Sequence, residues 1–184
     1  MTLTVTNLTD GSGERLTIDG TEIALVFGST TTATNALSLD INLVGTTATV
    51  SFSGATLSAA QLHTLIGSLA YRNILQGPTD ANRVVTITQL VDSGSNVAPS
   101  DNSAALSIAS TVNVDAVNDA PTLQLSNTGP GSTLAYQENQ PSTALSPTAI
   151  LDDVDSPNFG AGSLTISFQA NGTAADQLGL LPAG

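Results

Sequence analysis

Apolar and polar residues alternate with a period of two through much of the first 114 residues. Leu37, Leu39, Ile41 and Leu43 alternate with polar residues, and the segment 106–114 repeats the pattern. Successive side chains of a β-strand point to opposite faces, so this alternation predicts half-buried antiparallel strands. Further strands are expected at 3–7, 15–18, 22–27, 47–52, 69–73 and 83–91, with Gly, Asn, Asp and Pro in the gaps between them.

One segment has the pattern of a helix instead. Ser58 and Gln61 have the spacing of a capping box, and Leu57 and Leu62 have the spacing of a hydrophobic staple. The apolar residues that follow recur at helical spacing and lie on one face: Leu62, Leu65, Ile66 and Leu69. The pattern predicts a short amphipathic helix that crosses from one sheet to another.

The alternation ends at Val114 and is followed by the segment 115–121, which closes on a proline. Proline lacks an N–H group and favours extended backbone before it, so a boundary is expected there. Three short apolar stretches beyond it, 123–125, 134–136 and 164–168, are expected to be the opening strands of a second unit. The fold class expected is all-β: an antiparallel immunoglobulin-like β-sandwich with one short helix, followed by a partial second unit.

Charge narrows the range of partners. The chain has 15 acidic residues against three Arg and no Lys, a formal net charge of −12 and a pI near 4.1. Nucleic acids and anionic membrane surfaces are bound through clustered cations, so neither is an expected partner. The acidic surface is suited to divalent cations and to solubility outside the cell. No apolar run is long enough to span a membrane, and no export signal lies within these residues.

The chain lacks the motifs of common enzymes. It has no Cys, no nucleophile elbow, no glycine-rich phosphate loop and no zinc-protease motif. Its one histidine, His63, lies beside the apolar face of the predicted helix, where a structural or exposed role is expected. No Trp is present to form a sugar-binding platform beside a carboxylate pair. We therefore expect no enzymatic activity.

Two acidic clusters flank the predicted boundary. The first is Asp115-Ala-Val-Asn-Asp119, and the second is Asp152-Asp-Val-Asp155. Calcium takes six to eight hard oxygen ligands, which these carboxylates and amides can supply. Two simpler interpretations remain open, because Asp and Asn also form turns at strand ends and cap short helical turns.

Several short motifs resemble the cadherin-like tandem repeats of large bacterial surface adhesins of the RTX type. The sequences VNDAPTL, DVDSPNF, GSLTISF and ANGTAADQLG stand at 117–123, 153–159, 162–168 and 170–179, and LTIDG, LSAAQ and YRN stand before them. The segment around Glu138 is similar to the Pro-Glu-Asn element of cadherin repeats, and the segment around Asp92 is similar to another of their elements. The resemblance implies that 1–114 is the larger C-terminal part of one repeat. It further implies that 115–121 is a linker and that 122–184 is the N-terminal part of the next repeat, cut short.

The resemblance also implies a function and a site. Calcium would bind at the linker and stiffen it, with five ligands: Asp115, Asn118, Asp119, Asp153 and Asp155. The protein would act in cell adhesion, or extend a large secreted or cell-surface bacterial protein. Its partners would be calcium, neighbouring repeats of the same chain and a ligand on a cell surface.

Two alternatives to this function follow from the sequence. The chain could be a pure structural spacer, or it could bind glycans or ice through a Thr-rich β face. The second is suggested by the runs at 28–34 and 45–49, although ordinary exposed strand threonines account for them as well.

Overall fold

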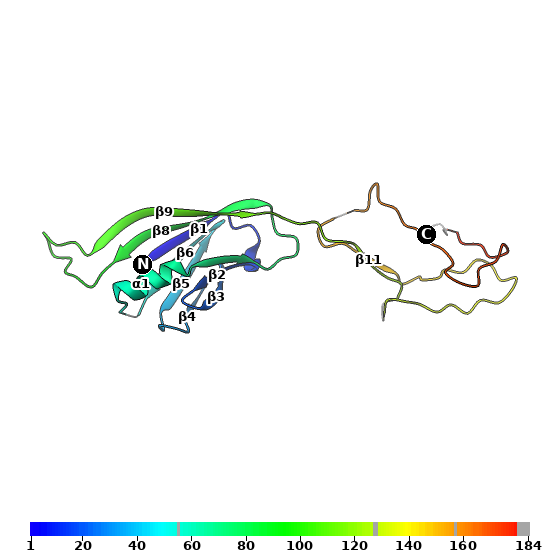
Figure 1. The fold of residues 1–184 in the computed structure, drawn as a ribbon, viewed down its shortest axis with the longest axis horizontal. Coiled ribbons are helices and arrows are strands. Elements are labelled where there is room, and N and C mark those ends of the chain that lie inside the picture. The colour runs from blue at the N-terminus through cyan, green and yellow to red at the C-terminus, as the bar shows by residue number, and fades with distance from the viewer. Residues whose placement is uncertain (55, 127–128, 157, 180–184) are drawn as a thin grey trace. The chain divides into compact units, whose positions relative to one another are not determined.

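A computed structural model describes residues 1–54, 56–126, 129–156 and 158–179 (Figure 1). The chain divides into two compact units, Met1–Val117 and Asn118–Gly184. The division falls inside the segment 115–121, where the proline-containing linker is expected.

The first unit contains a six-stranded antiparallel sheet. Its spatial order is β4-β5-β6-β1-β8-β9. The strands are β1 (Thr2–Thr6), β4 (Gly28–Thr31), β5 (Ser38–Val44), β6 (Thr47–Ser53), β8 (Ala81–Val91) and β9 (Ser103–Val114). The long β8–β9 hairpin forms one edge of this sheet, as Figure 1 shows.

A second sheet of three antiparallel strands completes the first unit. It comprises β2 (Glu14–Ile18), β3 (Thr21–Ala24) and β7 (Ala70–Asn73) in the order β3-β2-β7, and a 3-10 turn, η1 (Gly11–Gly13), precedes it. The turn between β2 and β3 consists of Asp19 and Gly20, and both have positive φ angles. A two-residue Asp-Gly turn of this kind matches the right-handed twist of the two strands that it joins.

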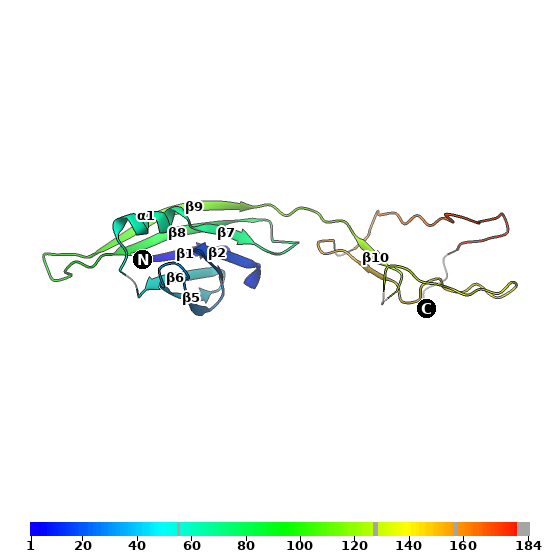
Figure 2. The ribbon, with the colours of Figure 1, turned by 60° about the horizontal axis from the view of Figure 1, so that its bottom comes forward.

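The apolar faces of the two sheets form one core. The large sheet contributes Leu3, Val5, Leu39, Ile41, Ala48 and Val50, and the small sheet contributes Leu16, Ile18 and Ile23. These side chains are the inward positions of the period-two pattern, since their neighbours along each strand are more exposed. The first unit is therefore an antiparallel β-sandwich, which confirms the predicted all-β fold class (Figure 2).

The helix α1 (Ala59–Gly67) joins β6 of the large sheet to β7 of the small one. Ser58 caps it: the Ser58 hydroxyl accepts from the Gln61 N–H, and the Gln61 side chain accepts from the Ser58 N–H at 2.9 Å. Leu65 is buried in the core, and Leu57 and Ile66 pack against it. The predicted capping box, amphipathic face and crossover are thus confirmed.

The second unit contains one hairpin-like pair of short strands. Strand β10 (Thr122–Gln124) pairs in antiparallel register with β11 (Ile150–Asp152). The predicted strands at 134–136 and 164–168 are wrong, because neither segment forms a ladder within the described residues. In the first unit, the strand predicted over 22–27 ends at Ala24, and β4 follows after a bend.

Candidate functional site

The second acidic cluster forms a tight turn directly after β11. The Asp153 carboxylate accepts hydrogen bonds from the N–H groups of Asp155, at 3.2 Å, and Ser156, at 3.0 Å. Desolvation raises the pKa of Asp153, but the Ser156 N–H, the Asp155 side chain and the Asp155 N–H outweigh it and hold the pKa below the usual 3.8. Asp153 is therefore ionised at neutral pH.

The same turn holds the start of the second unit. Asp155 accepts a hydrogen bond from the backbone N–H of Asp119 through one carboxylate oxygen, at 2.7 Å. Asn118 lies next to this contact, and its side-chain amide donates to the Asp119 carbonyl at 2.6 Å. The structure thus brings four of the five predicted ligand residues into one neighbourhood of the second unit: Asn118, Asp119, Asp153 and Asp155.

The fifth predicted ligand, Asp115, belongs to the first unit. It follows the last residue of β9, and its carboxylate accepts from the Asn113 side chain at 2.7 Å. This is the local turn chemistry that the sequence left open as an alternative.

The donor set of the second unit fits calcium in kind but does not form a closed cage. All its groups are hard oxygens, as calcium requires. Among the described residues, however, no three Asp, Glu or His side chains are grouped as metal ligands would be. The backbone N–H of Asp119 donates a hydrogen bond to the Asp155 carboxylate. One carboxylate oxygen of Asp153 accepts hydrogen bonds from two backbone N–H groups.

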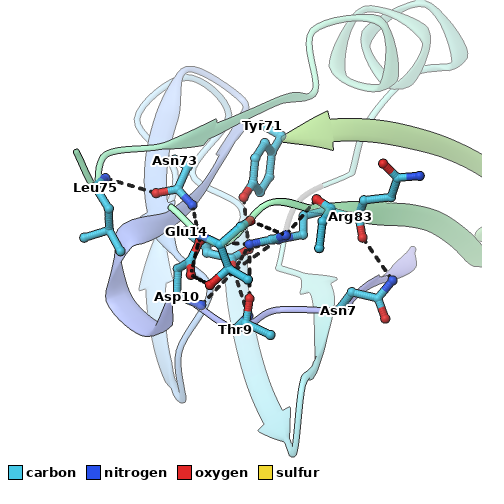
Figure 3. A network of polar contacts seen from close by, with 11 residues as sticks. Asn7, Thr9, Asp10, Glu14, Tyr71, Asn73, Leu75 and Arg83 are labelled. Carbon is cyan, nitrogen blue, oxygen red and sulfur yellow. Dashed lines mark hydrogen bonds and ion pairs between the residues drawn. The ribbon is translucent and has the colours of Figure 1, made fainter. Parts of the chain in front are cut away.

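A second polar cluster, which the sequence did not indicate, lies inside the first unit and is centred on Arg83 (Figure 3). The Arg83 and Glu14 side chains are completely buried, and that of Asp10 is 4% exposed. The Arg83 guanidinium donates to Asp10 at 2.8 Å and to Glu14 at 3.1 Å, and it also donates to the carbonyls of Thr79 and Ala81. All three charged side chains of this cluster are therefore paired, as burial of ions requires.

Neighbouring side chains complete this cluster. Asn73 and Thr79 donate to Asp10, and the Tyr71 hydroxyl donates to Glu14 at 3.0 Å. Desolvation raises the pKa of Asp10, but the hydrogen bonds from Thr79 and Asn73 and the charge of Arg83 outweigh it, so the pKa lies below 3.8. Burial, followed by the bond to Glu14 and its charge, raises the pKa of Tyr71 to about 12.

One signal in the sequence could have revealed the Arg83 cluster. Arg83 occupies an inward position of β8, and it is buried where the alternation calls for an apolar residue. A charge at such a position needs a buried partner of opposite sign. Glu14 stands at the corresponding inward position at the start of β2. The arrangement supports a structural role, since it ties the starts of β2 and β8 to the end of β7.

Comparisons with protein-family models, with curated proteins and with solved structures found no match. No helix in the described part of the chain is long and apolar enough to cross a membrane.

Proposed function

We propose that this chain is a cadherin-like extension module of a large secreted or cell-surface bacterial protein. Adhesion would be carried by the parent protein, and this part would lengthen and stiffen it. The single observation that carries the proposal is the direction of the first and last strands of the β-sandwich. The repeat-boundary sequence VNDAP, at 117–121, supports it.

Strands β1 and β9 run in the same direction, because both are antiparallel to β8 between them. Thr2 pairs with Gln89 at one end of β8, whereas Val114 pairs with Ala81 at the other end. These two levels are eight residues apart along β8, about 27 Å at 3.4 Å per residue. The start of β1 and the end of β9 therefore lie at opposite ends of the described sheet, which suits a module in a linear array.

The same topology determines how the module would carry tension. A force applied at Met1 and at the end of β9 acts along the strands, so it shears the β1–β8 and β8–β9 ladders. The hydrogen bonds of antiparallel ladders lie perpendicular to the strands, and shear loads many of them together. Tension through β1 and β9 is thus opposed by the β1–β8 ladder and by the β8–β9 ladder, which is the longest of the unit.

Single-molecule pulling tests this role. We expect the full chain pulled from its two ends to unfold the first unit at a higher force than the same chain pulled between positions 80 and 115. The second geometry opens the β8–β9 hairpin from its Ala81 and Val114 end, one pair at a time. Equal forces in the two geometries would contradict a load-bearing role.

Calcium binding is the second part of the proposal. Asp153 and Asp155 would supply carboxylate ligands, and Asn118 and Asp119 would add oxygen ligands from the start of the unit. Calcium would supply the positive charge that this acidic turn lacks. The supporting observation is the 2.7 Å bond between Asp119 and Asp155, which holds the predicted ligands close together.

Calorimetric titration of the full chain with calcium tests this part. We expect a dissociation constant of about 0.1 to 1 mM, as for extracellular modules. The double variant Asp153→Asn, Asp155→Asn should lose the heat of binding, while Asp80→Asn, an exposed residue of the first unit, should retain it. Unchanged calcium binding in the double variant would show that calcium binds at other residues. If the wild-type chain binds no calcium, only the spacer role remains.

A further inference from the structure

The chain has few cationic side chains, and they are unevenly placed. It contains three Arg and no Lys. Arg83 is buried and is neutralised by Asp10 and Glu14. Arg15 and Arg72 are therefore the only cationic side chains left for the surface of a protein with a net charge of −12.

These two arginines are direct cross-strand neighbours. Arg15 in β2 pairs with Arg72 in β7, so both side chains lie on the outer face of the small sheet. Residues in such a position have Cβ atoms about 5 Å apart, and like charges there are unfavourable unless an anion offsets them. The acidic side chain that contacts this pair is Glu22, at 3.5 Å from Arg72. Both side chains are largely exposed, 65% for Arg72 and 41% for Glu22. An exposed pair of this kind contributes little.

The Arg15 side chain forms no ion pair with an acidic side chain among the described residues. This side chain also takes part in none of the hydrogen bonds among the described residues, and its Nε atom is buried without a partner. The N–H groups of a buried arginine are normally hydrogen-bonded. An unpaired buried N–H group loses its hydrogen bonds to water, and no hydrogen bond within the protein replaces them. The half-buried Arg15 guanidinium lies next to the Arg72 guanidinium, and no anionic group in the described part of the chain pairs with it. An anion bound here would neutralise the two like charges.

We propose that Arg15 and Arg72 bind a carboxylate of an acidic, extended protein segment that lies on the outer face of the small sheet. Two guanidiniums present the forked donors that carboxylates accept in paired hydrogen bonds. Apart from Glu22, which pairs with Thr17, the face around them has small side chains, since Ala24 pairs with Arg15 and Ala70 pairs with Thr17. A flat face without bulky side chains favours an extended segment over an enclosed small molecule.

The experiment uses the Arg Nε–H signals of the isotope-labelled full chain in nuclear magnetic resonance. Three arginines give three such signals, which the variants Arg15→Gln and Arg72→Gln assign. The probe is a peptide with the chain's own acidic sequence 150–156, and its control has the three Asp replaced by Asn. We expect the acidic peptide to shift the Arg15 and Arg72 signals, to leave that of buried Arg83 in place, and to have a measurable affinity that the control lacks.

Variants then test the assignment. Arg72→Gln should weaken peptide binding by about fivefold, and Glu22→Gln should strengthen it by up to about fivefold because it removes a competing carboxylate. Arg72 is exposed, so its variant should fold normally. Three outcomes would overturn the proposal: no shift at millimolar peptide, equal shifts with sodium sulfate alone, or binding of oligogalacturonate without binding of the peptide. The result does not depend on calcium or on the extension role.

Discussion

At the scale of single residues, an arginine charge has different consequences inside the first unit and on its surface. Arg83 is completely buried, and its donors are all taken by Asp10, Glu14 and neighbouring oxygens. A buried ion pair is not necessarily more stabilising than an apolar pair, but removal of one member leaves the other charge buried and unpaired. Exposed Arg72 keeps water as an alternative partner, so its loss should matter far less.

We therefore expect Arg83→Gln to lower the free energy of unfolding by about 3 to 5 kcal/mol. Arg72→Gln is the matched control, because it makes the same chemical change at an exposed ion pair, and it should cost about 0 to 1 kcal/mol. Urea unfolding of the two variants measures both values. Similar costs for the two substitutions would show that the Arg83 cluster is not a stabilising element.

Tyr71 makes the stability of the first unit dependent on alkaline pH. Burial and the bond to Glu14 raise its pKa from 10.0 to about 12, so the folded state favours the protonated phenol. The resulting stability is fully present below pH 10, the unfolded value, and is lost as the pH rises through about 12. Ionisation would place a second negative charge next to Glu14.

The expected outcome is a decrease in the free energy of unfolding between pH 10 and about 12 that is absent from Tyr71→Phe. Urea unfolding at a series of pH values measures it. The tyrosinate absorbance of a Tyr136→Phe variant follows the Tyr71 titration alone, since the chain has two tyrosines. If the decrease persists in Tyr71→Phe, another group is responsible.

At the scale of elements, local patterns predicted most of the first unit. Ser58 and Gln61 lie three residues apart in the chain, so their reciprocal hydrogen bonds depend on no distant partner. The strands of the core were also predictable, because each inward residue alternates with a more exposed one. Both signals lie within a few neighbouring residues.

The elements that were missed depend on distant partners. Strand β11 is three residues long, and its only ladder is with β10, more than twenty residues earlier in the chain. The segment 164–168 alternates as a strand should, yet it pairs with nothing among the described residues. Apolar alternation shows that a segment can form a strand, whereas a ladder also needs a partner in register. The cluster of Arg83 was missed for the same reason, since Glu14 is 69 residues away in the sequence.

The candidate calcium ligands named from the sequence remain a prediction, and the structure gives only their positions. Sequence reasoning identified Asp119, Asp153 and Asp155 from family-like motifs, and these residues do lie together in the second unit. The orientation of Asp119 was not predictable, because it follows from the backbone bond to Asp155. That bond turns the backbone N–H of Asp119 toward Asp155.

At the scale of the whole molecule, the two units differ in how much apolar surface they bury. The first has a core of fully buried side chains such as Leu3, Leu16 and Leu39. In the described part of the second, the large apolar side chains are all exposed, from 37% for Leu134 to 69% for Leu164. Burial of apolar surface is the main favourable term in folding, so the two units should differ in local stability.

Hydrogen exchange measures this difference within the full chain. We expect the amides of β1, β5 and β6 to be the most protected, because they lie in the centre of the large sheet next to the core. Amides of the second unit should exchange much faster, including those of the β10–β11 pair, since two strands alone are marginally stable in water. Calcium that binds the turn at Asp153 and Asp155 should slow exchange at Asp119 and Ser156 and leave β5 unchanged. Protection of the second unit equal to that of the first, without calcium, would show that burial within this unit does not determine its stability.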